Sequence, residues 1–183
     1  MTYPFYQATN YTKGRNGHIP HLIVVHTMET PESEGRAKQV AGWFAGKTAP
    51  QASAHYMVDD KQVVQSVSEF DTAWAVDDYT LNQQSISIEH AGSASQSAEQ
   101  WNDAYSQAEL KLSAALAAEI ATRYRIPVVK LSPADILAGK AGICGHHDIT
   151  VAKAIAGGHT DPGTNFPWDA YLGLIKTHTQ ASS

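Results

Sequence analysis

The sequence predicts an α/β fold, in which a β-sheet carries helices on both of its faces. Three observations support this fold class. An apolar run at residues 22–26 is typical of a central strand that is covered on two sides. Amphipathic segments at 33–47 and 107–124 predict helices. Strand-like and helix-like segments alternate along a chain of 183 residues, which is close to the typical length of one domain, about 150 residues.

The first predicted strand ends at His26, and a helix follows it. Binding sites in open sheets tend to form at strand ends, so His26 is a candidate site residue. The helix over residues 33–47 is indicated by apolar residues at intervals of three and four positions, which are Ala37, Val40, Ala41 and Phe44.

A hairpin and a second strand come next. Residues 52–58 and 62–67 flank a polar turn and predict the hairpin. Residues 85–89 alternate strictly, which predicts a strand. Its two faces carry Ile86 and Ile88 on one side and Ser85, Ser87 and Glu89 on the other.

The second half of the chain begins with a small, polar segment at 91–103, which predicts a loop. The helix over 107–124 then presents a ladder of side chains four residues apart on one face. Pro127 ends this helix, and we expect residues 128–129 to open a strand. The ladder consists of Ala108, Leu112, Leu116, Ile120 and Tyr124.

The last part of the chain predicts two short helices. Ser132 followed by Pro133 is typical of a helix start. Residues 169–177 predict the closing helix. Residues 177–183 are small and polar, which indicates a tail or the start of a linker, so we expect the folded domain to span residues 1–176.

Composition excludes several function classes. Thirteen Lys and Arg against eighteen Asp and Glu give a net charge of −5, which argues against nucleic-acid binding and a polybasic membrane anchor. No apolar run approaches the roughly 18 residues of a membrane span. The N-terminus lacks the pattern of a signal peptide, so we expect accumulation in the cytoplasm. The single Cys144 excludes an internal disulfide and a Cys₄ zinc site.

Familiar hydrolase motifs are absent from the sequence, including the zincin helix and the nucleophile elbow. Cys144 would share a face with His146 on a strand, but a single cysteine with apolar flanks is more often a buried small side chain. The remaining candidates are His26, His146 or His147, and Asp161. Two imidazoles and one carboxylate make a catalytic zinc shell that leaves a position for water. Each residue alone also has a simpler explanation, such as a turn at Asp161 before Pro-Gly.

Six segments in register carry a family resemblance. The chain resembles the zinc-dependent N-acetylmuramoyl-L-alanine amidases, which share their fold with peptidoglycan recognition proteins. The resemblance implies a single mixed central β-sheet flanked by helices on both faces. The matching segments are 23–27 (IVVHT), 53–59 (SAHYMVD), 73–74 (AW), Asn82 with 85–89 (SISIE), 145–149 (GHHDI), and 160–163 (TDPG) with 166–168 (FPW).

The resemblance implies roles for individual residues. His26, His146 and Asp161 match the ligands of one Zn²⁺, with His146 rather than His147 in the ligand position. Glu89 matches the acidic position that handles the attacking water. His159 stands where the family often has a lysine thought to steady the oxyanion. Some phage relatives carry a catalytic tyrosine where this chain has Ala54, so a tyrosine-assisted reaction is disfavoured.

Three further residues are candidates for contact with substrate. His55 contacts substrate or packs under the sheet. Trp74 lines a groove or packs at the core edge. Asn82 touches substrate or holds a turn.

The resemblance implies a peptidoglycan hydrolase that cleaves the amide bond between N-acetylmuramic acid and L-alanine. The alternative is a recognition domain that binds peptidoglycan without cutting it, although such a domain has no need for all three ligands and Glu89. The expected setting is a phage endolysin that accumulates without a signal peptide, and the alternative is recycling of soluble muropeptides. We expect a monomer, with a separate or missing cell-wall-binding domain and no insertion into membranes.

Overall fold

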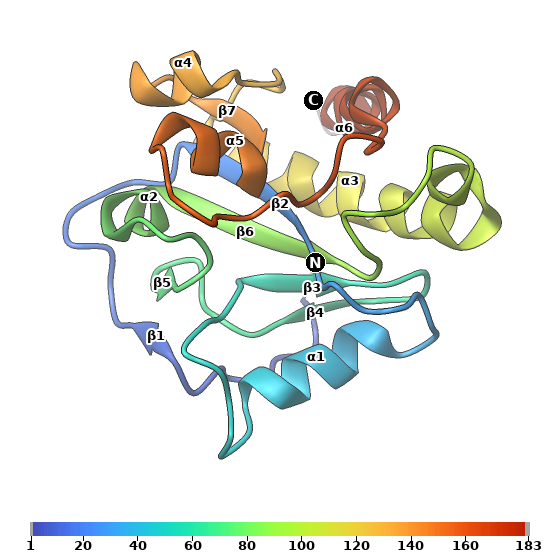
Figure 1. The fold of residues 1–183 in the computed structure, drawn as a ribbon, viewed down its shortest axis with the longest axis horizontal. Helices are drawn as coiled ribbons and strands as arrows, with labels where there is room; N and C mark the ends of the chain where they lie inside the picture. Colours follow the sequence, from blue (N-terminus) through green and yellow to red (C-terminus); the bar gives the residue numbers. More distant parts are fainter. Residues whose placement is uncertain (1, 182–183) are drawn as a thin grey trace.

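A computed structural model describes residues 2–181 of the chain, and Figure 1 shows its arrangement. The strands are β1 (Tyr11–Thr12), β2 (Leu22–Thr27), β3 (Tyr56–Val58), β4 (Val63–Gln65), β5 (Thr72–Ala73), β6 (Ser85–His90) and β7 (Gly142–Gly145). The helices are α1 (Arg36–Phe44), α2 (Tyr79–Gln84), α3 (Ala104–Tyr124), α4 (Pro133–Leu137), α5 (His146–Ala152) and α6 (Trp168–Ala181), with a 3₁₀ turn at Gln100–Asn102.

The central sheet has five strands in the order β4-β3-β6-β2-β7. β2 lies parallel to both β6 and β7, and β3 lies parallel to β6, whereas β4 pairs antiparallel with β3. The sheet is therefore mixed, as the resemblance implied, and the antiparallel pair is the predicted hairpin. In the register of β2 with β6, His26 lies opposite Glu89.

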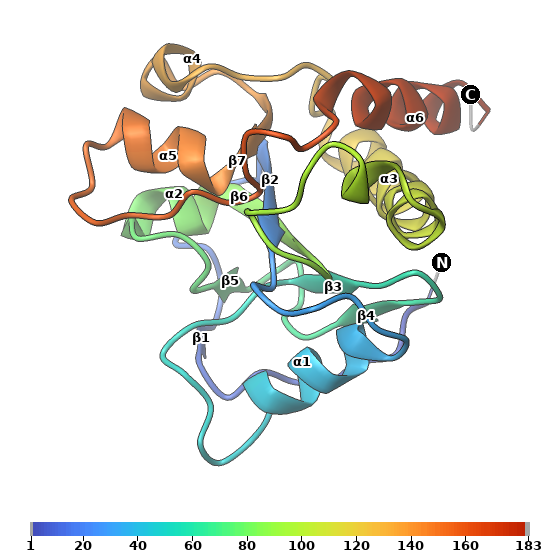
Figure 2. The same cartoon turned by 45° about the vertical axis from the view of Figure 1, so that its right-hand side comes forward.

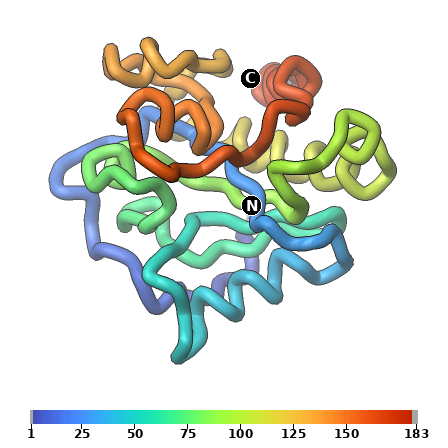
Figure 3. The backbone as a smooth tube through the Cα atoms, in the orientation of Figure 1, coloured from blue at the N-terminus to red at the C-terminus, as the bar shows by residue number. Residues whose placement is uncertain are grey.

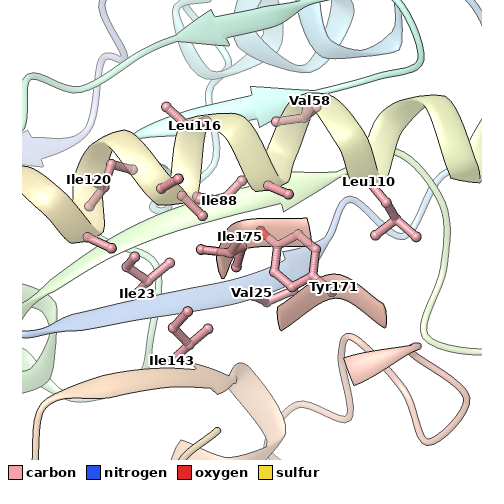
Figure 4. Close-up of a cluster of buried hydrophobic side chains, with 14 of the residues drawn as sticks. Ile23, Val25, Val58, Ile88, Leu110, Leu116, Ile120, Ile143, Tyr171 and Ile175 are labelled. Atoms are coloured by element: carbon pink, nitrogen blue, oxygen red, sulfur yellow. The ribbon is translucent and has the colours of Figure 1, made fainter. Parts of the chain in front are cut away.

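One face of the sheet packs against α3 and α6. Figure 4 shows Ile23 and Val25 of β2, Ile88 of β6 and Ile143 of β7 beneath these two helices. Full burial of such side chains stabilises the fold by about 1.5–3 kcal/mol each. This face is the main hydrophobic core.

The opposite face is covered in two places. α1 lies over β3 and β4, where Ala37 and Phe44 pack against Met57. Over β2 and β7, residues of α4 and α5 cover Val24 and Cys144. Figure 2 shows these two groups of helices apart from one another. Helices on both faces confirm the predicted fold class, and β2 is the strand that is buried on two sides.

Several predicted elements differ in extent from the structure. In α3 the buried face includes Leu110, Ala114 and Ala117, whereas Ala108 and Leu112 of the predicted ladder are only half-buried. Leu116 and Ile120 of the ladder lie in the core, but the buried face is wider than the predicted line of side chains because α6 and the sheet together cover it. Residues 128–129 do not open a strand, and only a single bridge from Lys130 to Ile143 forms there.

The end of the chain also differs from the prediction. α6 continues to Ala181, so residues 177–181 are helical rather than a tail, and residues 182–183 lie outside the described part. Within residues 2–181, no helix has the length and apolar character that crossing a membrane requires.

His90 faces α3 and α6, as the alternation of β6 predicts. Its ring is buried and lies 2.7 Å from Oγ of Ser113 and 3.0 Å from the backbone oxygen of His26. Burial lowers the pKa of His90 to about 4. The folded protein therefore resists protonation of a side chain that takes up a proton near pH 6.5 when unfolded.

We expect acid to destabilise the metal-free protein through His90. Below about pH 6.5 the unfolded chain binds more protons than the folded chain, so the free energy of unfolding falls as the pH falls. The contribution of His90 is about 2 kcal/mol between pH 7 and pH 5. Urea unfolding of wild type and His90→Gln at both pH values measures this change in the free energy of unfolding. An identical pH slope in the two proteins would contradict this expectation.

Candidate active site

The candidate site lies at the ends of β2, β6 and β7, beside the segment that joins α5 to α6. Figure 3 shows this segment passing the end of β2, although the two are far apart in the sequence. A cavity of about 240 Å³ opens here. Its walls include His26, Glu89, His146, His159, Asp161 and Trp74.

His26, His146 and Asp161 converge in this cavity. Nδ1 of His26 lies 3.2 Å from one carboxylate oxygen of Asp161, and Nδ1 of His146 lies 3.2 Å from the other. All three side chains are buried. The three residues offer ligand atoms that lie within 4.8 Å of one another, which suits a shared metal ion.

The local sequence places His146 at the first position of α5. β7 ends at Gly145, whose N–H donates to the carboxylate of Asp148 at 2.7 Å and so begins the helix. A side chain at Gly145 would overlap Pro162. Asp161 is held by the N–H of His147, which donates to its backbone oxygen at 2.8 Å.

His147 lies outside the cluster, as the resemblance implied. The backbone is helical at this point, so the side chain of His147 is rotated from that of His146 by one helical step, about 100°. Its side chain is exposed and its Nδ1 lies 3.2 Å from the backbone oxygen of His159.

Asp161 and Glu89 are carboxyl groups with opposite pKa shifts. Burial alone would raise the pKa of Asp161, but hydrogen bonds and charge from His146 and His26 hold it well below the usual range. Burial raises the pKa of Glu89 well above its usual value, and the negative charges of Asp161 and Glu29 add to that rise. Oε2 of Glu89 is buried and has no hydrogen-bond partner among residues 2–181. The pair therefore offers one fixed anion and one proton-exchanging group.

His159 stands at the open side of the cavity, and its side chain is 54% exposed. The ring stacks on His146 at 4.1 Å between centroids, with Nδ1 3.5 Å from Asp161. Nε2 lies 3.7 Å from the carboxylate of Asp77. The sequence reasoning missed Asp77, although it follows Trp74 closely in the chain.

His55 does not reach the cavity. It is fully buried, and its Nδ1 accepts a hydrogen bond from the Ser87 N–H at 3.1 Å. Burial lowers the pKa of His55 to about 3, and the charge of Arg15 adds to this effect. The structure therefore places His55 outside the cavity, where its ring is bonded to the backbone of β6.

Trp74 and Asn82 differ in where they lie. The ring of Trp74 lines the cavity and donates from Nε1 to Thr12 at 2.9 Å. Asn82 is buried beside the cavity, and its Oδ1 accepts from the N–H groups of Ala75 and Val76 at 2.9 Å. Asn82 thus holds a turn of the cavity wall, which is one of the two roles expected for it.

Cys144 and Glu29 lie on opposite sides of the cavity boundary, the first outside it and the second in its wall. Cys144 is buried beneath α4 and α5 and does not line the cavity, and burial raises the pKa of its thiol. Glu29 does line the cavity and was missed by sequence reasoning. Its position three residues after His26 was the available signal, because a loop that leaves a strand end lies near that end.

Comparisons with known proteins identify the family and the fold. Residues 16–164 match the family model described as N-acetylmuramoyl-L-alanine amidase. The chain has no significant sequence match among the curated proteins.

Solved structures share the fold. The Staphylococcus aureus hydrolase AmiA, solved in complex with its ligand, has a TM-score of 0.70 at 18% identity, covering 100% of this chain and 86% of that one. An AmpD derivative has a TM-score of 0.65 at 22% identity, covering 94% of each chain. A mutant endolysin from Bacillus subtilis has a TM-score of 0.65 at 17% identity, covering 96% of this chain and 99% of that one. Since the family model spans most of its length, the chain belongs to the N-acetylmuramoyl-L-alanine amidase family.

Proposed function

We propose that this chain is a zinc-dependent peptidoglycan hydrolase that cleaves the amide bond between N-acetylmuramic acid and L-alanine. The observation that carries the proposal is the convergence of His26, His146 and Asp161 in one cavity with Glu89. The proposed ligands are these three residues, for one zinc ion per chain. The membership of the chain in the N-acetylmuramoyl-L-alanine amidase family supports the reaction.

The donor set fits zinc. Each imidazole directs Nδ1 toward Asp161, whose lowered pKa keeps it anionic. Among the described residues, no lysine or arginine lines the cavity, so no positively charged side chain would occupy the metal site. Two imidazoles and one carboxylate leave a fourth position open, as in catalytic zinc sites.

Bound zinc supplies a Lewis acid that lowers the pKa of a water molecule and polarises the amide carbonyl. Glu89 accepts the proton of the attacking water and returns a proton to the nitrogen of the leaving L-alanine. A raised pKa suits a carboxyl group for both steps, because it exchanges protons nearer to neutral pH. Trp74 and the turn held by Asn82 form the wall along which substrate lies.

His159 is the proposed donor to the carbonyl oxygen as negative charge develops there. Its ring lies at the open side of the cavity, beside His146. A ring N–H donates one hydrogen bond to an oxyanion, with or without a positive charge.

We expect His159→Ala to lower kcat more than it raises KM, because the lost hydrogen bond belongs to the transition state. The expected loss is about 10- to 100-fold, which is at or below the lower end of what one oxyanion donor contributes, because the ring is exposed. His159→Lys should retain most of kcat. Steady-state kinetics on a soluble muropeptide measures both variants. Unchanged kcat and KM in His159→Ala would leave His159 without a catalytic role.

The experiment that tests the proposal combines two measurements on the purified protein. Elemental analysis determines zinc per chain, with one expected. Digestion of cell walls should release new α-amino groups of L-alanine without new reducing sugar ends. Tight binding of peptidoglycan without any release of amino groups would instead support the non-catalytic recognition domain.

A phage lysin acting on the cell wall is the setting that we propose, and endolysin-like folds support it. Activity on intact sacculi fits this setting, whereas activity limited to soluble muropeptides fits recycling. A monomeric enzyme that accumulates in the cytoplasm and works with a separate cell-wall-binding domain remains part of the prediction.

A further inference from the structure

Ser87 is a buried polar side chain that the proposed mechanism does not use. It lies in β6 on the face that carries Glu89, and it is fully buried. Its Oγ lies 3.3 Å from Nε2 of His26. We infer that Ser87 is a positioning residue that holds His26 in the ring orientation and tautomer needed for zinc. This inference rests on the proposed function, because it takes His26 to be a ligand.

The two nitrogens of His26 face different partners. Nδ1 points to Asp161 at 3.2 Å, and Nε2 points to Ser87. An imidazole that binds a metal through one nitrogen carries its proton on the other, and that N–H is usually held by an acceptor. The hydroxyl oxygen of Ser87 is such an acceptor. It favours the tautomer that leaves the lone pair of Nδ1 free toward the ligand cluster.

His146 lacks a corresponding partner. Its Nε2 is buried and has no hydrogen-bond partner among the described residues. Its ring is instead held by stacking on His159 and by its place at the start of α5. The hydrogen bond that Nε2–H of His26 donates to Oγ of Ser87 is therefore the one that fixes the outer nitrogen of an imidazole in this cluster, as far as residues 2–181 show.

The backbone of Ser87 is itself held on both sides. Its backbone lies opposite Val24 of β2. On its other side β3 begins only at Tyr56, and the Ser87 N–H donates to the ring of His55. That ring lies 2.8 Å from the guanidinium of Arg15, which donates to the backbone oxygens of Glu69 and Gln83 at 2.7 Å. A buried polar chain thus runs from Arg15 through His55 to Ser87 and His26.

The test compares zinc affinities of three purified proteins by competition with a chromophoric chelator. Ser87→Ala is expected to weaken zinc binding about 10- to 100-fold, the usual effect of removing such a partner. Ser85→Ala is the matched control, because Ser85 is buried two residues earlier in the same strand and its Oγ has no hydrogen-bond partner among the described residues. The control should bind zinc like wild type.

Further outcomes separate a positioning role from a structural one. Urea unfolding of the metal-free proteins should show similar stability for both alanine variants. Equal zinc affinity in wild type and Ser87→Ala, or the same loss in Ser85→Ala, would overturn the inference. Failure of wild type to bind zinc would overturn the proposed function instead.

A measurement on wild type avoids any folding defect of the variants. In ¹⁵N–¹H correlation spectra of the zinc-loaded protein, the ring of His26 should carry its proton on Nε2. A proton on Nδ1 would overturn the inference without affecting the proposed reaction.

Discussion

Glu89→Gln is expected to retain the fold and bound zinc but to lose about 10²–10⁴ in turnover. The substitution keeps the size of the side chain and removes its ability to accept a proton. Glu89 lines the cavity and its Oε2 lacks a partner among the described residues, so no structural hydrogen bond there is lost. Amino-group release under saturating substrate measures the effect, with zinc determined on the same sample.

A suitable control for Glu89→Gln is Glu99→Gln, a change of an exposed acid away from the cavity. This control should turn over like wild type. Near-normal turnover of Glu89→Gln with full zinc content would assign proton transfer to another group.

The second large effect is expected at the two adjacent histidines. His146→Ala should abolish zinc binding, because it removes one of three proposed ligands, whereas His147→Ala should retain nearly all of it. His146 is buried against Asp161 and His147 is exposed outside the cluster. Dialysis against a fixed concentration of free zinc, followed by elemental analysis, distinguishes the two variants. Retention by His146→Ala with loss by His147→Ala would reverse the assignment.

Much of the fold was predictable because the spacing of apolar residues and the residues at the ends of helices and strands are strong signals. β2 was found from its apolar run, and the alternation of β6 correctly placed Ile88 in the core and Glu89 on the other face. The start of α4 followed from its capping serine, whose side chain accepts the Asp135 N–H. These features depend on neighbours in the sequence, so the sequence alone shows them.

The errors concern features that depend on distant partners. The width of the buried face of α3 depends on α6, and the short bridge at Lys130 depends on β7. His55 and Asn82 were identified as notable residues, but their hydrogen bonds to Ser87 and to the turn at Ala75 turn them away from the cavity. Asp77 and Glu29 lie on loops that reach the cavity only in the folded chain, and their positions close to Trp74 and His26 in the sequence were the one signal available.

The three proposed ligands come from three separate parts of the chain: the end of β2, the start of α5, and the segment before α6. A bound zinc ion would therefore tie together segments that the unfolded chain leaves far apart, and the unfolded chain would lose this binding. Zinc binding free energy then adds directly to the free energy of unfolding. Above the dissociation constant, each tenfold rise in free zinc adds about 1.4 kcal/mol. With zinc bound as proposed, the midpoint of thermal unfolding would become a measure of free zinc, and in a zinc-poor medium the enzyme would lose part of its stability together with its activity.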